Sequence, residues 1–273
     1  MVIHYCWFGR GELPEEAKKC IASWKKYCPE YEIKEWNENN YDVNKNKYMG
    51  QAYKQKKYAF VSDYARLDII YNEGGVYFDV DVELIKNIDE LIKKGPFLGC
   101  EKNGRLLWFL RHKKNRIAVA PGLVIYAEKN NNIIKDILES YTNEEFVDEN
   151  GKENSKTIVT RTTEVLLKRG MIDKKGIQYL DNMTIYPKCY FCPLDYYTGT
   201  LKIKKNTYSI HRYVASWQSE EEKKLHDKTK KIAKVFGSSI AYNICIFCDN
   251  VKKEGVIKAC KAIIKKLKKQ EDK

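Results

Sequence analysis

Residues 74–83, GGVYFDVDVE, constrain the fold more than any other segment of the chain, because a strand-like pattern there carries three acids. Every second side chain from Val76 to Leu84 is apolar, which is typical of a β-strand with one buried face. The other face carries Tyr77, Asp79, Asp81 and Glu83. Two carboxylates two residues apart on a strand lie about 6–7 Å apart, on the same side. The segment therefore predicts either a solvated strand face or a metal site.

The composition narrows the class of protein without choosing a function. The 273 residues are enough for one large domain or two small ones. The net charge of +13 favours an anionic partner, which could be nucleic acid, a phosphorylated substrate or an acidic lipid surface. The nine cysteines are an odd number, so they cannot all pair with one another, and the N-terminus does not resemble a secretory leader. No run of the sequence approaches the roughly 18 apolar residues of a membrane span. We therefore expect a cytoplasmic protein, soluble or peripheral on the inner face of the plasma membrane.

Strand-like and helix-like segments alternate through the first two thirds of the chain, which predicts an α/β fold with a mainly parallel central sheet. The predicted strands are residues 2–8, 31–36, 74–84, 96–101, 105–110 and 117–126. The predicted helices are residues 14–27, 58–73, 131–141 and 157–169. From residue 219 the sequence changes to Lys-rich helical segments. We therefore expect a main domain over residues 1–218 and a helical appendage over residues 219–273.

The segment S-D-Y-A-R, residues 62–66, precedes the acidic segment and places Asp63 and Arg66 on one face of the predicted helix. Taken alone, this spacing is more often an exposed ion pair of little energetic value. Because Asp79 and Asp81 follow it in the sequence, the pair also fits a second interpretation. Asp63 would accept, and Arg66 would donate, hydrogen bonds to the hydroxyl groups or phosphates of a ligand.

The continuous string AFVSDYARLDIIYNEGGVYFDVD resembles the sugar-binding region of glycosyltransferase family 32. That family includes the large glucosylating bacterial toxins, the fungal initiating α-1,6-mannosyltransferases and bacterial capsular polysaccharide transferases. The segments IHYCWFG and SIHRYVASW resemble its first strand and its late His…Ser-Trp segment, and TRTTEVL and YPKCYFCPLDYYTG resemble the capsular branch. The resemblance covers residues 1–218 and implies a Rossmann-like fold of GT-A type.

The resemblance also implies roles for individual residues. Asp81 and His211 would ligate Mn²⁺ or Mg²⁺, for which oxygen ligands are suited. Asp79 would contact the ribose and the donor sugar, while Asp63 and Arg66 would hold the sugar hydroxyls. The further donor-binding positions are Trp7 for base stacking, Asn39 for the nucleoside, Ser62 and Tyr77 in the sugar pocket, and Ser216 and Trp217 over the diphosphate. From the residues alone, Trp7 and His4 would both be core side chains.

The implied activity is retaining, metal-dependent transfer of a hexose from a nucleotide-sugar in surface or capsular polysaccharide synthesis. The donor would be a UDP-hexose or GDP-mannose, and the acceptor a glycan or lipid-linked glycan. The alternatives are a basic nucleic-acid-binding protein and a metal-dependent nucleotidyltransferase or phosphohydrolase. The first is disfavoured by acids that repel phosphate, and the second by the lack of a Gly-rich phosphate loop. We therefore expect no nucleic-acid partner.

Two further features have two interpretations each. The C-x-x-C pairs Cys189/Cys192 and Cys245/Cys248 fit small buried thiols better than a zinc site. The amphipathic segment 256–267, rich in Ile and Lys, fits either a helix packed on the domain or one bound to an anionic membrane surface.

Overall fold

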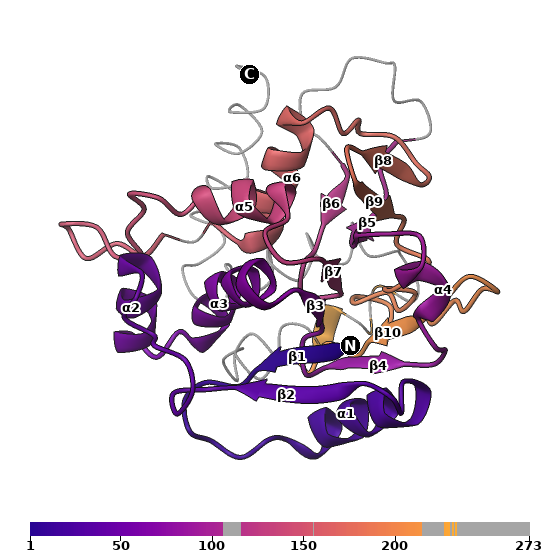
Figure 1. Cartoon of the computed structure of the whole chain (residues 1–273), viewed down its shortest axis with the longest axis horizontal. Coiled ribbons are helices and arrows are strands. Elements are labelled where there is room, and N and C mark those ends of the chain that lie inside the picture. The colour runs from indigo at the N-terminus through magenta and orange to yellow at the C-terminus, as the bar shows by residue number, and fades with distance from the viewer. Residues whose placement is uncertain (106–115, 155, 215–226, 230, 232, 234–273) are drawn as a thin grey trace. The chain divides into compact units, whose positions relative to one another are not determined.

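The computed structural model describes residues 1–105, 116–154, 156–214, 227–229, 231 and 233 (Figure 1). The helices are α1 Glu15–Tyr27, α2 Lys47–Lys54, α3 Tyr58–Glu73, α4 Asp89–Ile92, α5 Asn132–Glu139 and α6 Ile158–Lys168. The strands are β1 Val2–Cys6, β2 Glu32–Trp36, β3 Gly75–Tyr77, β4 Val82–Leu84, β5 Phe97–Lys102, β6 Ala118–Val119, β7 Ile125–Ala127, β8 Gln178–Leu180, β9 Met183–Tyr186 and β10 Ser209–His211.

The central sheet has eight strands in the order β2-β1-β3-β7-β5-β9-β8, with β6 paired to β5. Strands β1, β2, β3, β5 and β9 run in one direction, and β6, β7 and β8 run in the other. The predicted α/β fold with a mainly parallel sheet is therefore confirmed. Because β7 lies antiparallel beside β3, the turn that precedes β7 meets the carboxyl end of β3.

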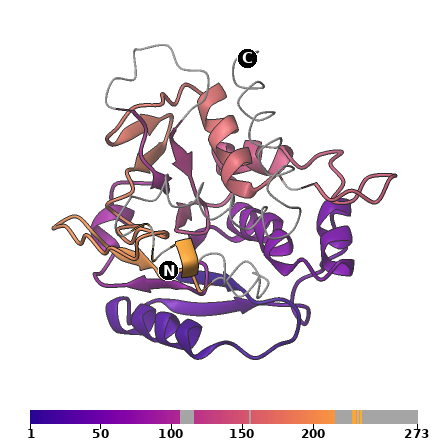
Figure 2. The ribbon, with the colours of Figure 1, turned by 180° about the vertical axis from the view of Figure 1, so that it is seen from behind.

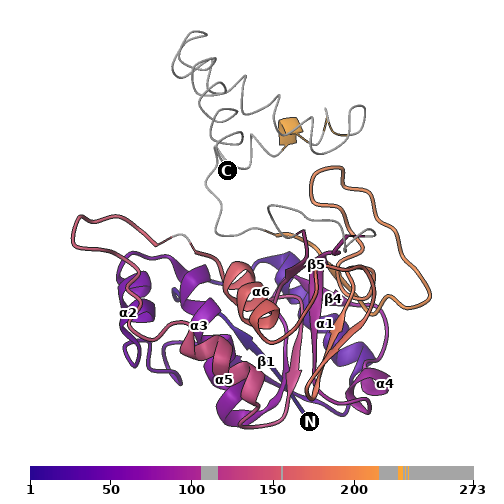
Figure 3. The same cartoon turned by 90° about the horizontal axis from the view of Figure 1, so that it is seen from above.

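Helices cover both faces of this sheet, with α3, α5 and α6 on one side and α1 and α4 on the other (Figure 3). Each face has its own apolar core. Leu67 and Ile70 of α3 are fully buried in the first core. Trp24 of α1 is fully buried in the second, and its Nε1 donates to the Val82 carbonyl at 2.7 Å. The two cores hold α3 and β4 in place, and these elements precede and follow Asp79 and Asp81 along the chain.

The acidic segment does not form the single strand that its alternation predicts. Strand β3 ends at Tyr77, and β4 begins at Val82 in a separate two-stranded sheet with β10 (Figures 1 and 2). Between them the Val82 amide donates to the Asp79 carbonyl at 3.0 Å, and the Asp79 amide donates to the Gly122 carbonyl at 2.9 Å. These bonds close a turn, so the D-x-D acids lie on a corner between two sheets.

The chain divides into one unit of residues 1–193 and 202–217 and a second of residues 194–201 and 218–273. Most of the second unit lies outside the described residues, so the appendage over residues 219–273 and the membrane-binding interpretation of residues 256–267 stay predictions. The predicted strand 105–110 lies outside them beyond residue 105. Within the described part of the chain, no helix is long and apolar enough to span a membrane.

Candidate active site

Helix α3 presents Asp63 and Arg66 one turn apart, as the sequence predicts. The helix ends at Glu73 because Gly74 adopts a φ of 70°, which favours glycine. The Arg66 side chain is only 5% exposed and the Asp63 side chain 13%, and their Nη2 and Oδ1 atoms are 2.9 Å apart. The exposed ion pair is therefore the wrong interpretation. A buried charged pair of this kind requires further partners to offset its desolvation.

Arg66 joins the helix to the D-x-D corner. Its Nη1 contacts Oδ2 of Asp79 at 3.1 Å, while its Nε donates to the Ser62 carbonyl at 2.9 Å. The guanidinium carbon lies 5.2 Å from the centre of the Tyr77 ring. Arg66 thus pairs with two carboxylates, so Asp63, Arg66 and Asp79 together carry a net negative charge when both acids are ionised.

Asp79 is fixed from two further directions. The Tyr77 hydroxyl donates to its Oδ1 at 2.9 Å. On the opposite side, Gly122 leaves no room for a side chain, since a Cβ there would lie 2.0 Å from Oδ2 of Asp79 and 2.7 Å from Nη1 of Arg66. Gly122 was not predicted from the sequence, where the only signal is the turn-forming Pro-Gly pair in APGLVI.

Asp81 turns away from Arg66 toward the end of β10. Its Oδ1 lies 3.2 Å from Nε2 of His211, and its Oδ2 accepts from the Val214 amide at 3.1 Å. The imidazole Nδ1 of His211 is buried and has no hydrogen-bond partner among the described residues. The structure therefore brings together the two residues that the sequence predicted as metal ligands, across 130 positions of the chain. The Val214 contact uses a main-chain amide, for which no sequence signal exists.

Burial and charge shift the pKa values of these groups in different directions. Burial raises the pKa of Asp63 to about 6 and raises the pKa of Asp79, against the opposing effect of the Arg66 cation. Burial alone would also raise the pKa of Asp81, but the His211 imidazolium and the hydrogen bonds to the carboxylate lower it instead. Burial would lower the pKa of His211, yet the Asp81 carboxylate raises it well above its ordinary value.

The pKa of Asp63 leads to a pH dependence of stability. Between the ordinary value of 3.8 and about 6, the folded protein binds more protons at Asp63 than the unfolded chain does. The contribution of Asp63 to the free energy of unfolding must therefore fall by roughly 3 kcal/mol in total as pH rises through this window. Above pH 6 the contribution levels off. We expect Asp63→Asn to gain stability relative to wild type between pH 4.5 and pH 7.5, measured by urea unfolding. Asp148→Asn, which removes an exposed loop acid, is the control, and parallel pH curves for wild type and Asp63→Asn would contradict the expectation.

The remaining predicted donor-binding residues are not all brought to this cluster. Trp7 follows β1, is half-buried and donates from Nε1 to the Gly11 carbonyl at 2.6 Å. Asn39 is exposed in the loop after β2, and the Ser62 hydroxyl donates to the Tyr58 carbonyl within α3. Their roles stay predictions. Ser216 and Trp217 lie outside the described residues.

His4 is a core histidine, as the residues alone predict. It is 2% exposed, its Nε2 is 3.0 Å from the Gly74 carbonyl oxygen, and its Nδ1 accepts from Nε1 of Trp36 at 3.0 Å. Burial lowers its pKa, so it is held neutral between the strands. His4 therefore fixes the Gly-Gly bend ahead of β3 and has no position in the acid cluster.

A metal ion held by Asp81 and His211 would take its remaining ligands from a bound phosphate group and from water. Within the part of the chain that the structure describes, no group of three or more His, Cys, Asp or Glu side chains is arranged to hold an ion. Asp81 and His211 offer one carboxylate and one imidazole, a donor set that suits Mn²⁺ with phosphate oxygens and water in the other positions. Cys189 and Cys192 are free thiols, and Cys245 and Cys248 lie outside the described residues, so zinc at the C-x-x-C pairs gains no support.

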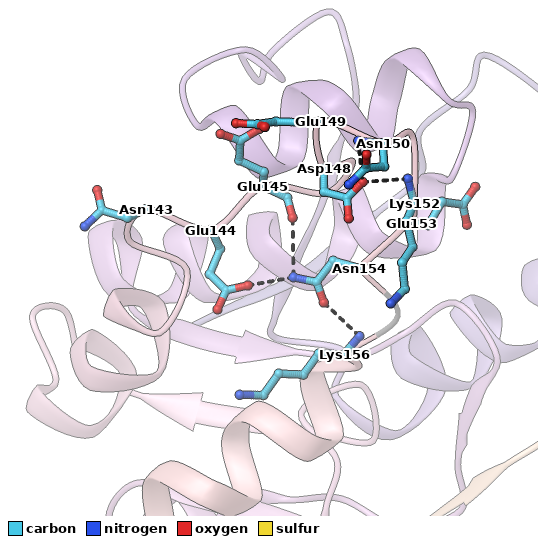
Figure 4. Close-up of a pocket in the computed structure, with 10 residues that line it drawn as sticks. All are labelled: Asn143, Glu144, Glu145, Asp148, Glu149, Asn150, Lys152, Glu153, Asn154 and Lys156. Atoms are coloured by element: carbon cyan, nitrogen blue, oxygen red, sulfur yellow. Dashed lines mark hydrogen bonds between the residues drawn. The ribbon is translucent and has the colours of Figure 1, made fainter.

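A separate hollow of about 810 Å³ lies in the loop between α5 and α6 (Figure 4). Ten residues between Asn143 and Lys156 line it, five of them acids, and none belongs to the Arg66 cluster. The Asn154 side-chain amide donates to Glu144 at 2.6 Å, and Glu144 accepts from Nη2 of the buried Arg161 at 3.1 Å. These bonds tie the loop to α6 and assign no ligand to the hollow.

Acids and a buried arginine gathered at the carboxyl end of a strand in an α/β sheet are typical of a ligand-binding site. Residues 14–98 match the family described as glycosyltransferase sugar-binding region containing DXD motif. The matched region contains Asp63, Arg66, Asp79 and Asp81. Residues 14–98 of the chain are therefore similar to the sugar-binding region of these glycosyltransferases. The comparison with curated proteins gives no match.

Three solved structures are similar to this chain at low identity. The PaToxG glycosyltransferase is 22% identical, with a TM-score of 0.43 over 61% of this chain and 68% of that one. A glycosyltransferase involved in glycosylation of the major capsid of PBCV-1 is 12% identical, with a TM-score of 0.43 over 84% and 98%. Galactosyltransferase LgtC, solved with donor and acceptor sugar analogues, is 13% identical, with a TM-score of 0.40 over 85% and 95%. The similarity to the DXD-containing family covers residues 14–98.

Proposed function

We propose that this chain is a retaining hexosyltransferase that uses a nucleotide-sugar and Mn²⁺ or Mg²⁺. The observation that carries the proposal is the bridge from Arg66 to Asp63 and Asp79, with the Asp81–His211 pair on the same corner. A sugar presents hydroxyl groups that both donate and accept hydrogen bonds. A fixed guanidinium between two carboxylates can satisfy both needs at neighbouring hydroxyls.

The charge of the cluster favours a donor that arrives with a cation. Among the described residues, Asp63, Asp79 and Asp81 form ion pairs with Arg66 and His211, two cations for three carboxylates, so a bare diphosphate would be repelled. When bound, a divalent metal neutralises the charge that develops on the leaving diphosphate. Asp81 and His211 would hold it, and Nε2 of His211 would have to release its proton first. Asp79 would face the ribose and the donor sugar.

We expect the transfer to retain the anomeric configuration by displacement on one face of the sugar. The acceptor hydroxyl forms the new bond to the anomeric carbon as the bond from that carbon to the diphosphate breaks. The proton of the acceptor hydroxyl passes to the departing phosphate. Arg66, held immobile by its two carboxylates, would keep the sugar in place for this step.

The donor and the setting follow from the resemblance to the capsular branch. We propose a UDP-hexose as the first candidate donor and GDP-mannose as the second, with a glycan or lipid-linked glycan of surface or capsular polysaccharide as the acceptor. The six described cysteines are all free thiols, which supports a reducing, cytoplasmic location.

Titration calorimetry with UDP and with GDP, each with and without Mn²⁺, tests the donor site. We expect one nucleotide to bind with at least tenfold higher affinity when Mn²⁺ is present, because the ion screens the diphosphate from the acids. Asp81→Asn should abolish that gain while keeping the side-chain volume. Glu83→Gln, which removes an acid two residues away on β4, is the matched control and should retain it. Binding that ignores both Mn²⁺ and Asp81 would contradict the proposal.

A further inference from the structure

The chain after β10 adopts a backbone conformation that few residues accept. Tyr213, two residues beyond His211, has a φ of 54°. This left-handed region is uncommon for residues other than glycine and especially for bulky ones. Such conformations persist where the surroundings hold them, and they are frequent at functional sites.

The left-handed residue directs the chain around Asp81. Before it, the Arg212 amide donates to the Asp81 carbonyl at 2.8 Å. After it, the Val214 amide donates to Oδ2 of Asp81 at 3.1 Å, while the other carboxylate oxygen faces His211. An extended residue at position 213 would carry the Val214 amide away from the carboxylate. The conformation of Tyr213 therefore sets the orientation of Asp81.

The Tyr213 side chain supports the second member of the pair. Its ring centre lies 4.1 Å from the centre of the His211 imidazole, with 50° between the ring planes. Its hydroxyl lies 3.0 Å from Sγ of Cys192, a fully buried residue of the apolar core on the α1 face. The Tyr213 ring thus packs against the imidazole while its hydroxyl contacts the core, so the position of the ring affects the packing of His211.

We propose that Tyr213 is a positioning residue for the metal site, in which its backbone aims the Val214 amide at Asp81 and its ring fixes the His211 imidazole. The inference rests on the proposed metal-dependent function. It adds to that function the residue that orients the two metal ligands, Asp81 and His211. Side chains that orient metal ligands without touching the ion commonly change metal affinity 10- to 100-fold when they are replaced.

Three substitutions separate the backbone from the ring. Tyr213→Phe keeps both and removes only the hydroxyl, Tyr213→Asn tolerates the left-handed backbone without the ring, and Tyr213→Val disfavours the backbone and lacks the ring. Mn²⁺ alone is titrated into each variant of the 273-residue chain, and the free ion is followed by its electron paramagnetic resonance signal. We expect affinity within about twofold of wild type for Phe, a loss of a few-fold for Asn, and a loss of about tenfold or more for Val.

Two controls make the outcome specific. Lys56 is another left-handed residue, with a φ of 57°, in the turn between α2 and α3, so Lys56→Val should leave Mn²⁺ affinity unchanged. Circular dichroism and urea midpoints show whether each variant is folded. If the Val variant unfolds, the Mn²⁺ affinity of Tyr213→Asn still tests the inference. Wild-type affinity in both the Asn and the Val variant would overturn the inference, provided that Asp81→Asn weakens Mn²⁺ binding. Binding that Asp81→Asn does not weaken, or no binding by wild type, would overturn the proposed metal site and this inference together.

Discussion

Replacing Arg66 with methionine should lower the rate of sugar transfer by about a thousandfold or more and cost roughly 3–5 kcal/mol of unfolding free energy. The guanidinium is 5% exposed and contacts Asp63 and Asp79 at 2.9 and 3.1 Å, so its loss leaves two partly buried carboxylates without the cation that they share. Methionine fills a similar volume, which limits the cavity that the substitution would create. Urea unfolding and steady-state transfer kinetics measure the two effects.

A double substitution tests whether charge is the cause. If the uncompensated carboxylates destabilise Arg66→Met, then adding Asp63→Asn should restore part of the lost stability, although not the activity. Arg66→Lys keeps the charge but cannot bridge two carboxylates with a planar fork, so it should retain stability better than activity. An Arg66→Met protein as stable as wild type, with no gain from Asp63→Asn, would contradict the assigned role.

Replacing Gly122 with alanine should reduce kcat/KM for the donor by about a hundredfold and cost about 1–3 kcal/mol of stability. The new Cβ would lie 2.0 Å from Oδ2 of Asp79, a carboxylate that Tyr77 and Arg66 already hold. Asp79 must then give up one of these partners or the turn before β7 must move. Either change displaces the acid that faces the donor sugar in the proposed function.

The matched control for this substitution is Gly50→Ala in α2. A Cβ at Gly50 would meet nothing closer than 3.4 Å, and its helical backbone accepts alanine. Alanine in a helix interior is favoured over glycine by about 0.5–1 kcal/mol, so Gly50→Ala should be neutral or slightly stabilising with normal kinetics. If Gly122→Ala behaves like Gly50→Ala, the close approach of Gly122 to Asp79 has no functional weight.

Local sequence patterns predicted the part of the site that lies on one element. The helical spacing of apolar residues over 58–73 and the Gly-Gly stop predicted α3 with its observed bounds, and they placed Asp63 and Arg66 on one face of it. The match of residues 14–98 to a DXD-containing region then agrees with the resemblance drawn from the same string. The spacing alone could not decide between an exposed ion pair and a ligand-binding pair, because it reports a shared helix face but not what covers that face.

The acidic segment shows why the rest could not be predicted. Strand β3, a turn and strand β4 happen to preserve a period of two across Val76, Phe78 and Val82, so the alternation survives although the strand is broken. The turn is fixed by Gly122, a residue 43 positions beyond Asp79, and no local pattern encodes that contact. Helix α2 and strands β8–β10 are short and were not predicted, since their stability comes from tertiary packing.

The main-chain contacts to the D-x-D corner affect which positions of such a site can change their residue during evolution. Asp79 bonds to the carbonyl of Gly122, and Asp81 bonds to the amides of Arg212 and Val214 through its carbonyl and carboxylate. Atoms of the peptide unit are the same whatever residue carries them, so a position such as Val214 can change its residue while the contact to Asp81 is kept. The recognisable portion of the chain, residues 14–98, is thus not a transplantable module. Moved alone into another protein, it would carry the acids without the backbone that orients them.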